Sequence, residues 1–296
     1  MKNAFIVLAH QLPNQLNSFL TQLLHNPEND IYVHINRINS NIIPEILQSE
    51  RVHISENNIC IHWGSDEILK AVLLMYKEVI NSNKDYHYVV VCTGQDLLVK
   101  QGLGSFLDNC NNQIFIDSKH ADQVFARSKL FHTWPEVYRR KYDKKFHPIR
   151  IMRGGRFILL KYFPFLFKKK IDEKWRKLDF YYDTFWHAFP FEVVKYIDKF
   201  LADNPSFMDM YRNAIIPEEH FFTTLIMQSP YKEYISFSSG SSHSLTYTKG
   251  VTNNHSVVLR ESDIGDISKS NRYLARKFDC RIDSGVIKYF EKNIEV

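Results

Sequence analysis

The sequence has 296 residues, of which 44% are hydrophobic, 14% aromatic and 24% charged, with only 10 Gly and 10 Pro. This composition is typical of a packed globular protein and excludes intrinsically disordered, collagen-like and mucin-like chains. The length allows one large hydrophobic core or two smaller ones. Because no run of about 18 uncharged apolar residues occurs, the sequence predicts no membrane-spanning helix.

The N-terminal residues and the cysteines predict a cytoplasmic protein. The apolar run over residues 4–9 is too short for a secretory signal and lacks a small-residue cleavage site. Cys60, Cys92, Cys110 and Cys280 are 32, 18 and 170 positions apart, which matches neither a disulfide framework nor a zinc pattern. We therefore expect four thiols in a reducing compartment.

Positive charge is concentrated in one part of the chain. The formal net charge is +5, yet residues 139–177 carry 15 Lys or Arg and 3 Asp or Glu, a net of +12 against −7 elsewhere. Within them, the segment from Arg156 to Lys170 is aromatic and aliphatic, which suits the headgroup layer of an anionic membrane, here the inner face of the plasma membrane. The alternative is a hydrophobic element packed on the protein with a solvated basic face. We expect no nucleic-acid partner, because no nucleic-acid-binding motif accompanies the charge.

The predicted elements alternate between strands and helices. The continuous apolar run over residues 4–9 predicts a strand buried on both faces. Pro13, followed by apolar residues at helical spacing up to Leu24, predicts a helix. Further strands are predicted over residues 31–35, 59–63, 88–93 and 113–116, and further helices after Gly64 and over residues 190–201, 217–227 and 284–292. This alternation predicts a three-layer α/β/α fold.

One domain with a basic aromatic insertion is the simplest organisation, because no repeat or low-complexity linker divides residues 1–296. In such sheets, ligands bind at the carboxyl ends of the strands, where the strand order reverses. The residues predicted at that edge are His10, Asn36, 63–65 and 94–96.

Most common catalytic motifs are missing. The chain has no P-loop, dinucleotide-binding fingerprint, nucleophile elbow or zinc-binding histidine pair. Its thirteen histidines are scattered, so we predict no metal site. What remains is Pro217 followed by Glu218 and Glu219, two carboxylates just inside a predicted helix start. A helix dipole stabilises carboxylates there, so a purely structural role is the alternative.

At this point the chain resembles the core-2/I-branching β-1,6-N-acetylglucosaminyltransferases and the related peptide O-xylosyltransferases, including bacterial members. Five motifs carry the resemblance, in the same order and across nearly the whole length. They are residues 6–10 with 29–35, 63–65, 94–97 with Lys100, 217–222 and 274–279.

The resemblance implies a GT-A-type nucleotide-sugar-binding fold, with residues 1–130 approximately as the nucleotide-binding half and 131–296 as the acceptor-binding and catalytic half. It also implies inverting transfer of GlcNAc, xylose or a similar sugar from a UDP-sugar without a metal cofactor. The chain contains no Asp-x-Asp, the motif with which most GT-A enzymes hold their cation. A metal-dependent enzyme using residues 261–263 instead is a weaker alternative, and a non-catalytic peripheral membrane protein on the same fold is another.

By position in the family motif, Glu219 is the base that deprotonates the acceptor hydroxyl, and Glu218 is structural. Lys277 matches the phosphate-binding lysine, which would offset charge on the leaving diphosphate. His255 stands where the family has a companion arginine, and Arg260 or Arg276 could replace it.

The resemblance also assigns donor contacts. Leu8, His10 and Asn36 should form the pocket for the nucleotide base. Asn36 stands where the family commonly has aspartate, which leaves the base open, since an amide can both donate and accept. Asp96 is expected to orient sugar hydroxyls, with a turn aspartate as the alternative.

Acceptor recognition is assigned to Tyr247 and Trp63, whose rings could stack on a sugar. Because the chain lacks the disulfides and membrane anchor of the animal enzymes, the resemblance favours a cytoplasmic bacterial transferase of surface polysaccharide synthesis. Its acceptor would be a glycan or a lipid-linked glycan near the segment from Arg156 to Lys170.

Overall fold

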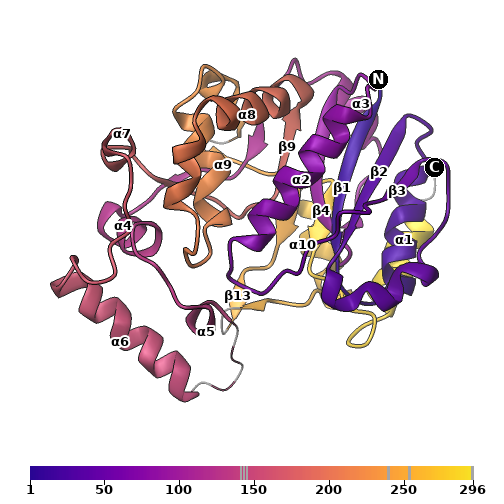
Figure 1. Ribbon diagram of the computed structural model, residues 1–296. Helices are drawn as coiled ribbons and strands as arrows, with labels where there is room; N and C mark the ends of the chain where they lie inside the picture. Colours follow the sequence, from indigo (N-terminus) through magenta and orange to yellow (C-terminus); the bar gives the residue numbers. More distant parts are fainter. Residues whose placement is uncertain (141, 143, 145, 239–240, 253–254, 295–296) are drawn as a thin grey trace.

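A computed structural model describes the chain except residues 141, 143, 145, 239–240, 253–254 and 295–296 (Figure 1). Its centre is a six-stranded sheet in the order β3-β2-β1-β4-β9-β6. The strands are β1 (Asn3–Ala9), β2 (Asn29–Ile35), β3 (Val52–Ile54), β4 (Tyr88–Thr93), β6 (Phe115–Ile116) and β9 (His187–Pro190). The first four are parallel, and β9 is antiparallel to both β4 and β6.

Helices cover both faces of this sheet because its strands are apolar on both sides. All seven residues of β1 are buried. Ile6 belongs to the core cluster with α2 (Glu67–Asn81), α8 (Phe191–Asp203) and α9 (Glu218–Met227), whereas Val7 belongs to the cluster with α1 (Pro13–Leu24), α10 (Ile264–Lys269) and α11 (Gly285–Asn293). The predicted α/β/α fold class is therefore confirmed.

The remaining elements lie around this core, and all of them except α6 are short. A second sheet has the order β12-β15-β5. Its strands and the two-stranded pairs are β5 (Leu97–Leu98), β12 (Thr246–Thr248), β15 (Leu274–Arg276), β7 (Lys119–His120) with β8 (Tyr181–Tyr182), β10 (Phe237–Ser238) with β11 (Ser241–Ser242), and β13 (Val251–Thr252) with β14 (His255–Ser256). The other helices are α3 (Leu103–Asp108), α4 (Gln123–Leu130), α5 (Glu136–Arg139), α6 (Pro148–Tyr162), α7 (Glu173–Arg176) and the 3-10 helices at Arg37–Glu45, Pro205–Met210, Lys232–Tyr234 and Glu261–Asp263.

The strand predicted over residues 59–63 is wrong. Side chains, rather than a neighbouring strand, bind this segment's backbone. Ile59 N donates to His34 Nε2 at 3.0 Å, and His62 N donates to a Glu67 carboxylate oxygen at 2.8 Å. Asn36 bonds both the N–H and the carbonyl of Ile61.

The two predicted halves of the chain share one sheet. Strand β9, from the second half, lies between β4 and β6 of the first. The basic stretch over residues 139–177 holds α6 and α7, and α5 lies at its start. Figure 1 shows α6 at the periphery, away from the central sheet. Among the described residues, we find no helix with the combined length and apolar character needed to cross a bilayer.

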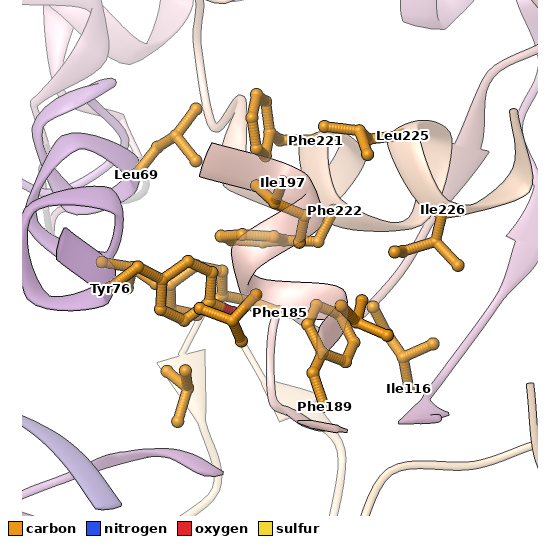
Figure 2. Close-up of a cluster of buried hydrophobic side chains, with 14 of the residues drawn as sticks. Leu69, Tyr76, Ile116, Phe185, Phe189, Ile197, Phe221, Phe222, Leu225 and Ile226 are labelled. Carbon is orange, nitrogen blue, oxygen red and sulfur yellow. The ribbon is translucent and has the colours of Figure 1, made fainter. Parts of the chain in front are cut away.

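Aromatic packing fixes α9 against the sheet and α2. Phe222 is fully buried, and its ring centroid lies 4.5 Å from that of His187 in β9 and 5.8 Å from that of Tyr76 in α2. Figure 2 shows Phe221 and Phe222 within this cluster. The start of α9 is thereby held in place.

Truncation of this ring should destabilise the protein. We expect Phe222→Ala to lower the free energy of unfolding by about 3–5 kcal/mol, because the cavity cannot collapse between a sheet and two helices. Urea unfolding would measure the loss. The control is Ile282→Ala, at a side chain that is 46% exposed, which should change stability by about 0.5 kcal/mol or less. A loss below about 1 kcal/mol for Phe222→Ala would contradict this packing.

Candidate functional site

The loops that follow β1, β4 and β15 meet at the carboxyl ends of β1 and β4. The chain leaves β1 toward β2 on one side, whereas β4 lies on the other, so the strand order reverses here. Gly94 N donates to Leu8 O at 3.0 Å, and a Cβ on Gly94 would lie 3.0 Å from the Ala9 Cβ. Only glycine therefore lets the loop after β4 approach β1 this closely.

Two glutamines hold the loop after β15 against this edge. Gln15 of α1 donates to Phe278 O at 3.1 Å and accepts from Cys280 N at 2.9 Å. Gln95 Nε2 donates to the same Phe278 carbonyl at 3.2 Å, and Phe278 N donates to Gln95 O at 2.9 Å. The residues beside Phe278 are thus brought to the ends of β1 and β4.

Cations gather at that point. The Arg276 guanidinium lies 3.7 Å from the Trp186 ring centroid, and its Nε lies 3.6 Å from Asp96 Oδ1. Partial burial and the nearby charges of Lys277, Arg281 and Arg276 lower the pKa of His10. The structure therefore brings together four predicted site residues (His10, Asp96, Arg276 and Lys277) and adds Arg281, which is paired with Asp279 through bonds of 2.9 and 2.6 Å.

The Asp96 carboxylate makes hydrogen bonds within its own turn, and its sugar-orienting role stays a prediction. Its side chain is buried, and its two oxygens accept from Thr93 N at 2.9 Å and Thr93 Oγ1 at 2.6 Å. Burial raises the pKa of this carboxyl, and the Arg276 charge counteracts that rise. Asp96 is thus a turn aspartate that positions Arg276.

Asn36 and Leu8 are also occupied within the protein. The Asn36 amide donates to Ile61 O at 2.8 Å and accepts from Ile61 N at 3.1 Å and Ile38 N at 3.2 Å. It positions residues 59–63, and its contact with a nucleotide base stays a prediction. The Leu8 side chain is buried in the core.

Arg260 and Tyr247 lie on segments that adjoin the cations, since Leu259 N donates to Lys277 O at 2.9 Å and Thr248 of β12 is in register with Arg276. Arg260 is exposed, and its charge acts on Asp283. Tyr247 is half-buried on β12, in register with Ala275, and packs against the core. The side chain of His255 lies outside the described part of the chain. In residues 261–263, Asp263 is buried and pairs with Lys249, so it faces inward.

The carboxylates of α9 form the second part of the site. The Glu219 side chain is 30% exposed, and its Oε2 lies 3.8 Å from Nζ of the buried Lys129 on α4. Burial raises the pKa of Glu219, and Lys129 counteracts that rise. Burial of Lys129 lowers its own pKa, which Glu219 and Glu218 oppose.

Two neighbouring acids have raised pKa values. Burial and the charge of Glu219 raise the pKa of Glu218 to about 8, and its Oε2 makes no hydrogen bond to any described residue. Burial likewise raises the pKa of Asp183 to about 8, although Thr223 and Phe185 N donate to it. Lys129 acts on both glutamates of α9, and its Nζ lies within ion-pair distance of Glu219.

The segment before β9 connects the two parts of the site. Asp183 N donates to Glu219 O at 2.8 Å, and Trp186, three residues later, stacks on Arg276. Three residues span at most about 11 Å, so one short segment contacts both the backbone of Glu219 and the Arg276 guanidinium. Gly64 O accepts from Ile216 N at 2.9 Å, which places the partly exposed Trp63 beside the start of α9.

Sequence reasoning missed Lys129, Asp183, Trp186 and Arg281. Their partners are distant in sequence, and Lys129 lies in an ordinary polar helix. The signal that was present is the aromatic density of residues 180–190, which predicts a buried segment around Trp186. A surface hollow of about 590 Å³ beside α3 contains none of the predicted site residues. Among the described residues, no group of three or more His, Cys, Asp or Glu side chains could hold a metal ion.

Comparison with known proteins adds little. No family model and no curated protein matches the chain. A solved structure named as a glucose-1-phosphate thymidylyltransferase of Bacillus anthracis, in complex with sucrose, has a TM-score of 0.33 and 12% identity, over 67% of this chain and 75% of its own. A 4-diphosphocytidyl-2C-methyl-D-erythritol synthase of Anaerococcus prevotii has a TM-score of 0.31 and 14% identity, over 72% and 86%. Such values carry no argument about this chain, and the family resemblance of its motifs stays a prediction.

The buried acid Glu218 should make stability depend on pH. Its pKa in the folded protein lies above the ordinary value, so folding retains a proton that the unfolded chain releases. Stability present at low pH should therefore be lost as the pH rises through about 8, by up to about 1.4 kcal/mol per pH unit. Glu218→Gln should flatten this slope in urea unfolding between pH 5 and 8. Glu233→Gln, at a side chain that is 79% exposed, is the control, and equal slopes in both variants would refute the burial of this acid.

Proposed function

We propose that the protein is an inverting glycosyltransferase that moves a sugar from a UDP-sugar to a hydroxyl of a glycan or glycolipid without a metal ion. Glu219 is the general base, and the cations at the end of β15 receive the diphosphate. The proposal combines the family resemblance with the arrangement of the two parts of the site.

The observation that carries it is the contrast between adjacent carboxylates. Glu218 is buried and holds a proton near neutral pH, whereas Glu219 is partly exposed beside Lys129. A base must be charged and accessible, and a pKa raised toward neutrality makes it stronger. Of the two, only Glu219 meets both requirements.

The reaction follows as a single displacement. The acceptor oxygen forms a bond to the anomeric carbon, its proton passes to Glu219, and the bond from that carbon to the diphosphate oxygen breaks. The leaving diphosphate gains negative charge, which Lys277, Arg276 and Arg281 would offset. Asp96 and Trp186 hold Arg276 in place for this purpose.

Donor and acceptor follow from the resemblance and from what remains accessible. We assign UDP-GlcNAc, UDP-xylose or a similar donor, with His10 beside the phosphates. Because the Asn36 amide is occupied by Ile61, base recognition falls to other groups. Trp63 and Tyr247 are proposed to contact the acceptor, and the reaction would serve bacterial surface polysaccharide synthesis in the cytoplasm.

A non-catalytic peripheral membrane protein is the second candidate. The observation that favours it is the exposed apolar surface of α6, because membrane binding through that surface would not require a catalytic site. Such a protein would release no UDP from a UDP-sugar, and steady release of UDP would exclude it.

Replacement of the base should separate chemistry from binding. We expect Glu219→Gln to reduce turnover by at least about 100-fold, because the amide cannot take the acceptor proton. Release of UDP from UDP-GlcNAc or UDP-xylose, with a panel of glycan acceptors, measures turnover, and thermal shift with UDP measures binding, which should not change.

The neighbouring Glu218→Gln is the matched control. Because Glu218 already holds a proton, its amide variant should keep turnover within a few-fold of the wild type. Near-normal turnover in Glu219→Gln, or an equal loss in both variants, would refute the assignment of the base.

Chelation tests the role of the cations. Transfer should persist in EDTA, because protein side chains rather than a divalent ion would offset the charge of the leaving group. The measurement is initial rate with EDTA and with added Mg²⁺ or Mn²⁺. Complete loss of turnover in EDTA, restored by metal, would contradict the metal-free mechanism while leaving Glu219 as the base.

A further inference from the structure

Helix α6 turns an apolar face to the solvent. Five large hydrophobic residues on it are between 50% and 68% exposed, namely Ile151, Met152, Ile158, Leu159 and Tyr162. They recur at steps of one, six, one and three residues, which places them on one side of an α-helix. Phe165, in the loop that follows, is 70% exposed.

The arginines of α6 face the protein instead. Arg153 donates to Tyr138 O at 3.1 Å and to Arg140 O at 3.3 Å. Arg156 is buried, donates to Thr133 O, and lies 4.1 Å from the Phe167 ring centroid. The face that α6 turns to the solvent is therefore aliphatic rather than basic, although Leu160 and Phe157 pack against the protein as the alternative from the sequence predicts. A helix with arginines inside and aliphatic side chains outside is not adapted to water.

Charge around this face points to an anionic partner. Residues 139–177 carry a net charge of +12. Lys161, Lys168 and Lys170 are exposed at or just beyond the end of α6. A second copy of the chain would bring the same positive charge against itself, whereas an anionic bilayer offers both negative headgroups and an apolar layer.

Direct contacts connect α6 to the candidate base. The Phe157 ring stacks on Phe125 of α4, with centroids 5.7 Å apart. Lys129 Nζ lies 4.7 Å from the Phe125 centroid and 3.8 Å from a Glu219 carboxylate oxygen. The surface of α6 is therefore three side-chain contacts away from Glu219.

We propose that the outward face of α6, with residues 163–167, inserts into the headgroup layer of an anionic phospholipid bilayer, where Lys161, Lys168 and Lys170 contact lipid phosphates. Docking in this way would present Glu219 to an acceptor carried on a membrane lipid. This second part rests on the proposed function, whereas the docking itself does not.

Flotation with vesicles tests the docking. The full chain should float with vesicles that contain phosphatidylglycerol and should not float with pure phosphatidylcholine. Ile158→Asp with Leu159→Asp should weaken binding at least about tenfold, because two apolar side chains are lost from the inserted face. Ile38→Asp, at a side chain 57% exposed as against 61% for Ile158, is the matched control and should bind like the wild type.

Three further measurements make the result decisive. Urea unfolding should show that the double variant is as stable as the control, since both change exposed positions. Glu219→Gln should float like the wild type, so loss of transfer and loss of docking can be told apart. The docking is overturned if the wild type does not float with phosphatidylglycerol vesicles or if the double variant floats equally well. It is also overturned if light scattering shows that the wild type is a dimer, that the double variant is a monomer, and that neither binds vesicles.

Discussion

Two buried amide side chains determine where the cations of this protein lie. Gln15 and Gln95 both donate to the Phe278 carbonyl, one from a helix and the other from the loop after β4. Each bond is ordinary in strength. Loss of one amide would leave the Phe278 carbonyl bonded to the other, but loss of Gln15 would also take the partner of Cys280 N, and an unpaired buried group costs about 1–3 kcal/mol. The placement of Arg276 and Lys277 at the sheet edge therefore depends on residues that would never touch a substrate.

A single buried lysine has a comparable role for the carboxylates. Lys129 favours the charged form of Glu219, while burial raises the pKa of Glu218 and that of Asp183 to about 8. Differences in exposure thus give neighbouring acids of similar chemistry different charge states. Since Lys129 also lies over Phe125, helix α4 couples the electrostatics of the base to the packing of α6.

The sequence was sufficient where local pattern decides structure. The apolar run of β1 and the helical spacing of the apolar residues in α1 predicted both elements, because burial of a whole strand or of one helix face leaves a local pattern of apolar residues in the sequence. The strand predicted over residues 59–63 was wrong, because the side chains of His34, Asn36 and Glu67 accept the hydrogen bonds of this segment's backbone N–H groups. The roles of Asp96 and Asn36 stay predictions, because motif position indicates an edge of the sheet, whereas the hydrogen bonds that these two side chains make within the protein depend on residues outside the motifs.

The position of β9 has a consequence for synthesis of the chain. Strand β6 reaches the sheet only through β9, which is made some 70 residues later, and β4 has no neighbour on that side until then. A nascent chain that ends near residue 130 would expose β4 as an open, apolar edge, the kind of edge at which strands from other chains add. The edge of β4 is therefore paired only after β9 has been synthesised, and until then the first half of the chain is exposed to aggregation.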